Sequence, residues 1–243
     1  MNYQQLFANV QTYLENQFPN VFLADGTSVN ATTQINTFIE QAEQRIYNSV
    51  QFPSIRKNVT GNLTVSNQYL STPNDFLSTY SLAVIDSSGN YTYLLNKDVN
   101  FIREAYPIPS GTGLPKYYAL FGPTVNGGAI TNELSFIVGP TPDQSYAVEL
   151  HYYYYPVSIA DTVNNPSGTS WLGDNFDTVL LYGTLVEANT YMKGEADLTA
   201  LYNQKYMEAL QLAKRLGDGL ERSDAYRNGQ FRLPPLPQNN GVQ

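Results

Sequence analysis

The fold is decided by VELHYYYYPVSIADTVNNPSGTSWL (residues 148–172), a stretch with four consecutive tyrosines, Tyr152, Tyr153, Tyr154 and Tyr155. The segment YAVELHYYYYP predicts a strand, and side chains along a strand point alternately to its two faces. The tyrosines therefore place aromatic rings on both faces of a sheet. We expect one face to pack on a β-core. We expect protein on the other face as well, either the segment around Trp171 or a neighbouring subunit.

Short β-prone runs, punctuated by Gly, Pro and Asn, precede this strand. They are NVTGNLTV, YLSTPNDFLSTYSLAVI, YTYLL, KYYALF and ELSFIV, and DSSGN joins SLAVI to YTYLL as a hairpin. Between them, KDVNFIREAYP predicts a short helix capped by Asn96 and stopped by Pro107. The pattern indicates an antiparallel β-module of about five to seven strands over residues 55–156.

Helical periodicity flanks the β-module on both sides. One apolar stripe near the N-terminus ends near NQFPN, and a second begins at a cap on Asn30 or Thr32 and is closed by Pro53. After the connector ADTVNNPSGTS, the segment DNFDTVLLYGTLVEANTYMKG is apolar on most sides, which predicts a helix buried on most sides. A fourth stripe begins at Leu198 and stops at LGDG, residues 216–219.

The predicted fold class is therefore α+β, with an antiparallel helical bundle of about four helices and an inserted antiparallel β-module. Residues 1–54 and 157–225 form a discontinuous helical domain, and residues 55–156 form the inserted β-domain. Residues 226–243 form an extended Pro-rich C-terminal tail, because its prolines are incompatible with regular structure.

Amino-acid composition narrows the classes of function that the chain could have. A hydrophobic content of 42% in 243 residues indicates a globular chain with a real core. The net charge of −8 disfavours binding to phosphates and suits a surface that should not stick to DNA. The absence of cysteine excludes disulfides and thiolate sites. The N-terminal segment lacks the apolar core of a signal peptide, and no run has the length of a membrane span, so we expect no membrane association.

We expect no catalytic residue, no cofactor and no metal site. The single histidine, His151, lies in the tyrosine strand without a recognisable catalytic partner and is interpreted as structural. Paired carboxylates could in principle hydrolyse glycosides. The candidates, which exposed turns and strand edges also explain, are Asp75, Asp86, Glu104, Glu133 and Glu149.

Glu187 is a charged residue inside the most apolar predicted helix. It is either a buried carboxylate paired with Arg or Lys from another helix or subunit, or a residue on the one wet side of the helix. An unpaired buried charge would be costly, but the sequence favours neither interpretation.

The C-terminal tail carries a clearer functional signal. YRNGQFRLPPLPQ joins arginines to large apolar residues on a proline-stiffened backbone, which loses little entropy on docking into a groove. We predict that this segment docks on a partner. The docking residues are Tyr226, Arg227, Phe231, Arg232, Leu233, Pro234 and Leu236.

Four segments in order resemble a known family: NVTGNLTVSNQYLSTPNDFLSTYSLAV, LHYYYYPV, WLGDNFDTVLLYGTLVEANTYMKGEADLTALYNQKYMEAL and the Pro-rich tail. They resemble the head-to-tail adaptor (connector) proteins of tailed phages, of the tail tubular protein A type. The resemblance covers roughly residues 30–215. It is most specific in the C-terminal third, where Trp171 and Leu172 precede LLYGTLVEANTYMK.

The resemblance implies an α-helical domain with an inserted β-domain and a structural role without catalysis. It implies a twelve-fold ring of this chain beneath the portal protein, with a tail nozzle or other tail proteins attached below. DNA would pass through the channel without specific binding, and the C-terminal segment would reach along the portal. The protein would lie in the neck or tail of the virion after assembly in the host cytoplasm.

Two other functions compete with this one. A carbohydrate-binding β-module is the main alternative, because exposed aromatic rings on a sheet can stack on sugars. A glycan-degrading enzyme that uses two of the carboxylates is the third.

Overall fold

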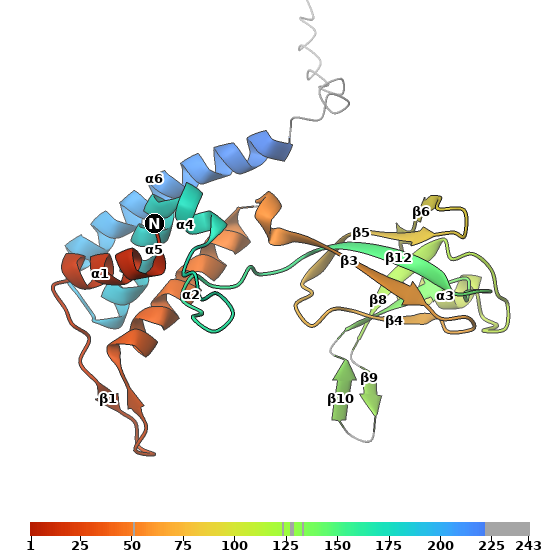
Figure 1. The fold of residues 1–243 in the computed structure, drawn as a ribbon, viewed down its shortest axis with the longest axis horizontal. Helices are drawn as coiled ribbons and strands as arrows, with labels where there is room; N and C mark the ends of the chain where they lie inside the picture. The colour runs from red at the N-terminus through yellow and green to blue at the C-terminus, as the bar shows by residue number, and fades with distance from the viewer. Residues whose placement is uncertain (51, 123, 127–128, 133, 222–243) are drawn as a thin grey trace, which may run out of the picture. The chain divides into compact units, whose positions relative to one another are not determined.

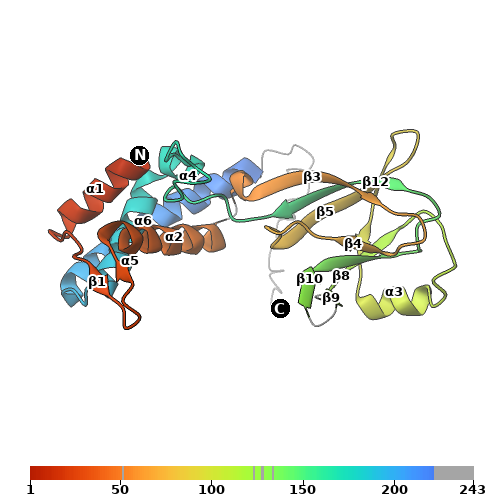
Figure 2. The same cartoon turned by 60° about the horizontal axis from the view of Figure 1, so that its bottom comes forward.

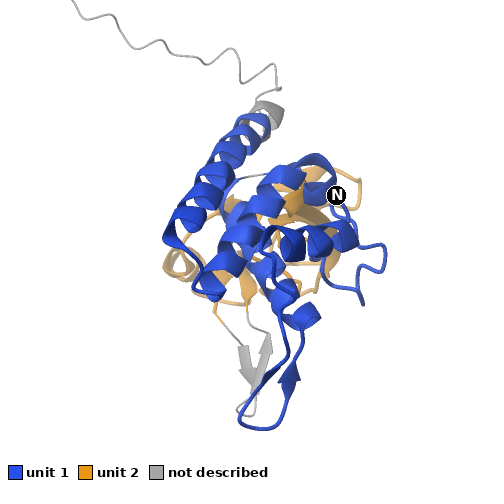
Figure 3. Cartoon of the chain, turned by 90° about the vertical axis from the view of Figure 1, so that its left-hand side faces the viewer, with its two compact units in different colours: residues 1–53, 157–243 blue, residues 54–156 orange. Residues whose placement is uncertain are grey.

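The computed structural model describes residues 1–50, 52–122, 124–126, 129–132 and 134–221, with only the backbone at 124–126, 129–132 and 217–221 (Figure 1). The chain forms two compact units, coloured separately in Figure 3. Residues 1–53 and 157–243 make up one unit, here called the helical unit, and residues 54–156 the other, the β unit. The described elements are a mixture of helices and mainly antiparallel sheets, so the predicted α+β class is confirmed.

The helical unit contains, in its described part, α1 (Tyr3–Tyr13), α2 (Ala31–Ser49), α4 (Trp171–Asn175), α5 (Asp177–Tyr191) and α6 (Ala196–Glu221). A two-stranded antiparallel hairpin of β1 (Val21–Phe22) and β2 (Ser28–Val29) joins α1 to α2. Neither this hairpin nor α4 is predicted from the sequence.

Side-chain caps fix where several of these helices begin. Of the two caps predicted for α2, Asn30 is right, since its side chain accepts a hydrogen bond from the backbone N–H of Thr33 at 2.9 Å. Ser170 caps α4 in the same way, through the N–H of Gly173. The predicted stop of α6 at LGDG is wrong, because the helix runs on to Glu221. Glycine lowers helix propensity by only about 1 kcal/mol, so a long helix can continue through it.

α5 is the central helix of this unit and contacts α1, α2, α4 and α6. Its residue Gly183 lies between the side chains of Ala42 on α2 and Tyr206 on α6. A Cβ at Gly183 would come within 3.3 Å of both. The missing side chain therefore lets the neighbouring helices approach α5 closely, and the predicted burial of α5 on most sides is confirmed.

An ion pair joins α5 to α2. The carboxylate Oε1 of Glu187 lies 2.8 Å from Nη2 of Arg45, and the Glu187 side chain is only 18% exposed. The Arg45 guanidinium also lies 5.7 Å from the ring centroid of Tyr206. Of the two interpretations left open for Glu187, the structure shows the pair with a basic residue from another helix.

The β unit begins with a 3-10 turn that ends at Ile55 and contains two four-stranded sheets. One sheet has the order β3-β12-β5-β6: β3 (Arg56–Leu63), β12 (Tyr146–Tyr153), β5 (Ser78–Ile85) and β6 (Tyr91–Tyr93). The other has the order β4-β11-β8-β7: β4 (Tyr69–Ser71), β11 (Ser135–Gly139), β8 (Tyr117–Phe121) and β7 (Leu95–Asn96). A separate hairpin pairs β9 (Thr124–Asn126) with β10 (Ala129–Asn132), and α3 (Val99–Ala105) follows β7.

Several predictions for the β unit need correction. It has more strands than the predicted number, and it is not wholly antiparallel, because β7 pairs with β8 in parallel. α3 is capped by Asp98, whose side chain accepts from the N–H of Asn100, and not by Asn96. The strand β12 ends at Tyr153, so Tyr154 and Tyr155 lie beyond it. It ends there because the facing residues, Arg56 of β3 and Ser78 of β5, are the first residues of their strands.

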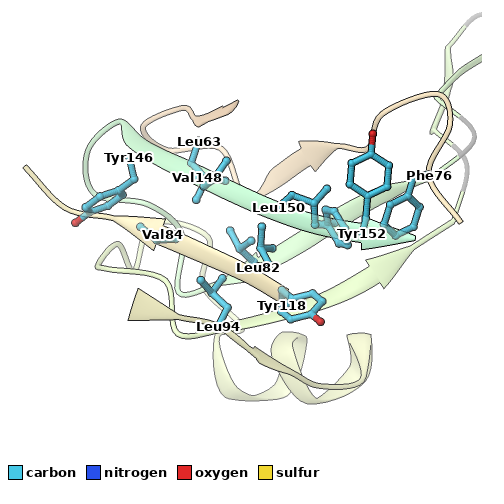
Figure 4. Close-up of a cluster of buried hydrophobic side chains, with 12 residues drawn as sticks. Leu63, Phe76, Leu82, Val84, Leu94, Tyr118, Tyr146, Val148, Leu150 and Tyr152 are labelled. Carbon is cyan, nitrogen blue, oxygen red and sulfur yellow. The ribbon is translucent and has the colours of Figure 1, made fainter. Parts of the chain in front are cut away.

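The core of the β unit lies between the two sheets (Figure 4). Buried side chains come from β12 and β5 on one side and from β8 and β11 on the other, and they include Leu82, Tyr118 and Phe136. Figure 2 shows α3 on the side of the β4-β11-β8-β7 sheet away from β12, where Ile102 packs on Ala119 and Ile137. Each residue of β11 is therefore buried, and this strand is covered on both faces.

Candidate interaction surfaces

β12 has one buried face and one open face. Tyr146, Val148, Leu150 and Tyr152 alternate on the inner face and are all buried. Figure 4 shows Tyr146 at one end of this row and Tyr152 at the other. Glu149, His151 and Tyr153, which alternate with these residues along the strand, are partly exposed on the outer face. Neighbouring tyrosines in the run thus have different surroundings.

Tyr152 is the most buried of the four tyrosines, with 1% of the residue exposed. Its ring packs on Phe76, and its hydroxyl donates a hydrogen bond to Oδ1 of Asp75 at 2.8 Å. Burial, together with this bond to a carboxylate, raises the pKa of the Tyr152 hydroxyl. The second oxygen of Asp75 accepts from Nζ of Lys57 at 2.8 Å, so the buried ring ends in a polar cluster at the edge of the sheet.

Tyr154 belongs to the same cluster although it lies outside the strand. Its ring lies 6.3 Å from that of Tyr152, and the Lys57 ammonium lies 5.0 Å from its centroid. Partial burial acts against ionisation of Asp75, but the hydrogen bonds from Lys57 and Tyr152 hold the pKa of this carboxyl below its ordinary value. Each oxygen of Asp75 therefore accepts a hydrogen bond from within this cluster.

The outer face of the β3-β12-β5-β6 sheet carries a group of aromatic side chains, here called the outer tyrosine face. Tyr80 of β5 and Tyr91 and Tyr93 of β6 are 46%, 53% and 66% exposed. Tyr153 of β12 packs edge-on against Tyr80 with ring centroids 6.0 Å apart. The Arg56 guanidinium lies 4.9 Å from the Tyr80 centroid. This face combines exposed rings with a cation held over one of them, a composition typical of protein interfaces.

A polar network lies beside these rings. Glu149 accepts hydrogen bonds from the Tyr91 hydroxyl and from Nδ2 of Asn58, the latter at 2.7 Å, and lies 3.3 Å from Nε2 of His151. The bond from Tyr91, followed by that from Asn58, lowers the pKa of the Glu149 carboxyl. His151 is thus a partly exposed residue of this network.

The predicted carboxylates have separate surroundings. Asp86 accepts backbone hydrogen bonds within the turn that joins β5 to β6, and Glu104 lies on α3. Asp75 and Glu149 belong to the two clusters described above, and Glu133 lies outside the described residues. No cluster of three or more His, Asp or Glu side chains suited to a metal ion occurs among the described residues.

Trp171 lies in the helical unit, where it is the first residue of α4. Its ring packs on Phe52 at 5.1 Å and on Phe176 at 5.4 Å between centroids, and the residue is 39% exposed. The structure therefore places Trp171 in a different aromatic cluster from Tyr152 and Tyr154. The predicted docking residues, from Tyr226 to Leu236, lie outside the described residues.

Glu43 is a buried charged residue that the sequence analysis missed. It is 3% exposed on α2, and its Oε1 accepts from the backbone N–H of Ile159 at 3.1 Å. The Ser158 hydroxyl also donates to it. One signal was available, since position 43 follows Ile39 by four residues and precedes Ile46 by three, on the apolar face of the helix. Glu43 therefore links α2 to Ser158 and Ile159, which lie at the start of the second segment of the helical unit.

Replacing Glu43 with Gln should remove a pH dependence of stability. Burial raises the pKa of Glu43 to about 7 from an ordinary 4.5, although the bonds from Ser158 and Ile159 act in the opposite direction. The folded state therefore binds this proton more tightly, and the free energy of unfolding falls as pH rises between 4.5 and 7. For a shift of this size the fall is about 3 kcal/mol, and this group contributes no further change above that window.

Urea unfolding of the full chain at pH 5 and pH 8 tests this prediction. Glu43→Gln keeps an oxygen that can accept from Ile159 and cannot ionise, so its stability should differ much less between the two pH values. The matched control is Glu40→Gln, one turn away on the exposed side of α2. It should keep most of the wild-type difference, because the Glu40 charge is the smallest of the causes that shift the pKa of Glu43. An equal pH dependence in Glu43→Gln and the wild type would contradict the prediction.

Together, these observations describe a two-unit α+β protein. Its candidate interaction sites are groups of aromatic side chains, of which the outer tyrosine face is the most exposed. The sequence model of the SU10 adaptor protein family matches residues 1–233, and the chain therefore belongs to this family. It is a phage adaptor-type protein, which makes it a structural component of the virion. No curated protein matches the chain significantly. Within the described part of the chain, no helix has both the length and the apolar character needed to cross a membrane.

Proposed function

We propose that this protein is a head-to-tail adaptor of the tail tubular protein A type. It forms a ring under the portal, bridges the portal to the tail nozzle or other tail proteins, and lines the channel through which DNA leaves the capsid. The observation that carries this proposal is the match to the SU10 adaptor protein family over residues 1–233, which spans both units. In this proposal α1, α2, α5 and α6 form the antiparallel bundle, the β unit is an inserted domain and the proline-rich tail is extended.

Ring formation needs a contact that differs on the two sides of each subunit and repeats around the circle. The outer tyrosine face supplies a suitable surface for one side of that contact. Its three most exposed rings, Tyr80, Tyr91 and Tyr93, are large and amphipathic, and Tyr153 and Arg56 hold Tyr80 in place. Covering this face with a neighbour would also give the second face of the tyrosine strand the protein cover that the sequence leads us to expect.

The charge of the chain supports the proposed channel. A net charge of −8 gives a surface that repels the DNA backbone, so DNA can slide past without being held. Lining a channel requires no catalytic site, and we propose that the protein is not an enzyme and needs no cofactor.

Electron microscopy of the chain mixed with the portal protein of the same phage tests the proposal. We expect class averages with an extra ring of density on one end of the portal, with twelve-fold symmetry. Portal particles that keep their own outline at saturating concentrations of folded adaptor would contradict it. Filter binding to duplex DNA at physiological salt should show no specific retention.

Sugar binding is the second candidate, favoured by the position of Tyr91 and Tyr93 beside the polar groups of Asn58, Glu149 and His151. Rings for stacking and groups for hydrogen bonding to hydroxyls are then on one face. A glycan array probed with the full chain decides this point. Binding that Tyr93→Ser abolishes, combined with no effect on the portal, would replace the adaptor proposal.

A further inference from the structure

The helical unit has an open pocket of about 360 Å³ between the start of α5 and the residues from 205 to 216 of α6. Its wall is mostly apolar, and three charged side chains, Asp177, Lys205 and Glu208, stand around it. The apolar lining comes from Phe176, Val179, Tyr182, Ala209, Leu212 and Leu216. The volume is within the range of pockets that bind ligands of the size of a few side chains.

Two leucines make the α6 wall of this pocket unusual. Leu212 and Leu216 are one turn apart, so they lie on the same face of the helix, and they are 61% and 57% exposed. A neighbouring face of α6, about a quarter of a turn around the helix, already meets the core through Tyr206 and Ala213. α6 therefore has a second apolar face, in a pocket that could bury it.

The residues that follow α6 have the composition to fill this pocket. The segment 226–237 contains Phe231, Leu233 and Leu236, two arginines and no acidic residue, in a chain with a net charge of −8. Its apolar side chains match the lining, and its arginines match the carboxylates of Asp177 and Glu208. Its prolines reduce the entropy lost on docking.

The stretch between the end of α6 and Phe231 is long enough for the segment to reach the pocket. Thirteen residues of helix between Glu208 and the end of α6 at Glu221 span about 20 Å. Ten further residues lead from Glu221 to Phe231, and an extended segment of that length spans up to about 33 Å. The segment can therefore turn back along α6 and bring Phe231 to the pocket of its own chain.

We propose that residues 226–237 dock in the α5–α6 pocket of the same chain when no portal is present. Phe231 and Leu233 cover Leu212 and Leu216, and the arginines face Asp177 and Glu208. A short tether keeps the segment at a millimolar effective concentration, which favours the chain's own pocket over that of a second copy. Because a portal would compete for the same residues, the pocket holds the tail back until a portal displaces it.

Spin labels can test this docking because the chain has no cysteine of its own. The full chain would carry Gln211→Cys, on α6 beside the pocket, and Gln238→Cys, just beyond the docking segment. Pulsed electron spin resonance should give one narrow distance population. Leu212→Ser with Leu216→Ser should eliminate that population. Leu201→Ser is the matched control, since Leu201 is an exposed leucine of α6 outside the pocket lining, and should leave the population unchanged.

Each outcome decides the proposal. A broad distribution that is the same in the pocket variant and the wild type would overturn it. A narrow population that disappears on tenfold dilution with unlabelled chain would show that the tail docks on a second copy, which overturns docking on the same chain. The measurement uses no portal, so its result is independent of whether the adaptor proposal holds.

Discussion

Removal of residues 226–243 should weaken portal binding by at least about a hundredfold and leave the protein folded, since losing two or more anchor side chains has this effect at interfaces. The segment contains Phe231, Leu233 and Leu236 as apolar anchors, with Arg227 and Arg232 between them. Among the described residues, the buried side chains of α6 are Tyr202, Tyr206, Leu210 and Ala213, all well before the cut.

Calorimetric titration against the portal protein and thermal melting by circular dichroism measure the two effects. The matched control removes only residues 238–243, which lie beyond the predicted docking residues, and it should bind like the full chain. Intact binding by the longer truncation would show that the tail is not the docking element. A small fall in melting temperature is expected, because the truncated chain also loses the docking of its tail in the α5–α6 pocket. Loss of the folded circular dichroism spectrum would show that the tail is part of the fold itself.

Tyr152→Ser should mainly reduce stability, and Tyr153→Ser should mainly reduce assembly, although the two residues are adjacent. Replacing Tyr152 removes a buried ring and its bond to Asp75, which should lower the free energy of unfolding by about 3 kcal/mol or more. Replacing Tyr153 removes a partly exposed ring that packs on Tyr80, with a loss of at most about 1 kcal/mol. Tyr153→Ser should instead impair assembly into the ring on the portal.

Urea unfolding and assembly assays on both variants check this pair, and each variant is the control for the other. Equal losses of stability would contradict the division of β12 into a buried and an open face. Normal assembly by Tyr153→Ser, and by a further variant with Tyr80 and Tyr93 both changed to Ser, would rule out the outer tyrosine face as the ring contact.

Features that depend on local patterns could be predicted from the sequence. The hairpin of β5 and β6 follows from DSSGN between two β-prone runs, and α2 follows from its apolar stripe and the Asn30 cap. Burial of α5 follows from the lack of a polar face. In each case the residues that decide the structure are close together in the chain.

Features that depend on distant residues could not be predicted. The end of β12 at Tyr153 is set by where β3 and β5 begin, and the parallel pairing of β7 with β8 joins segments on either side of α3. The predicted cap of α3 was wrong because Asn96 and Asp98 lie close together and both residue types are good caps, so the sequence does not distinguish between them.

The outer tyrosine face is a candidate site that also depends on residues distant in the sequence. The run Tyr152–Tyr155 identified β12, yet the most exposed rings are Tyr80, Tyr91 and Tyr93, which come from two other strands. A register shift between His151 and Tyr152 helps to decide which side chains of β5 and β12 share a face. Such a shift has no signature in the sequence of either strand alone.

The central claim is that this chain assembles as a ring on a portal, and native mass spectrometry of the chain mixed with the portal protein of the same phage tests it most directly. We expect the mass of the portal complex to rise by twelve adaptor chains of 27.1 kDa each, with no partly filled species at saturation. A portal mass that does not change, with both proteins folded, would contradict the claim.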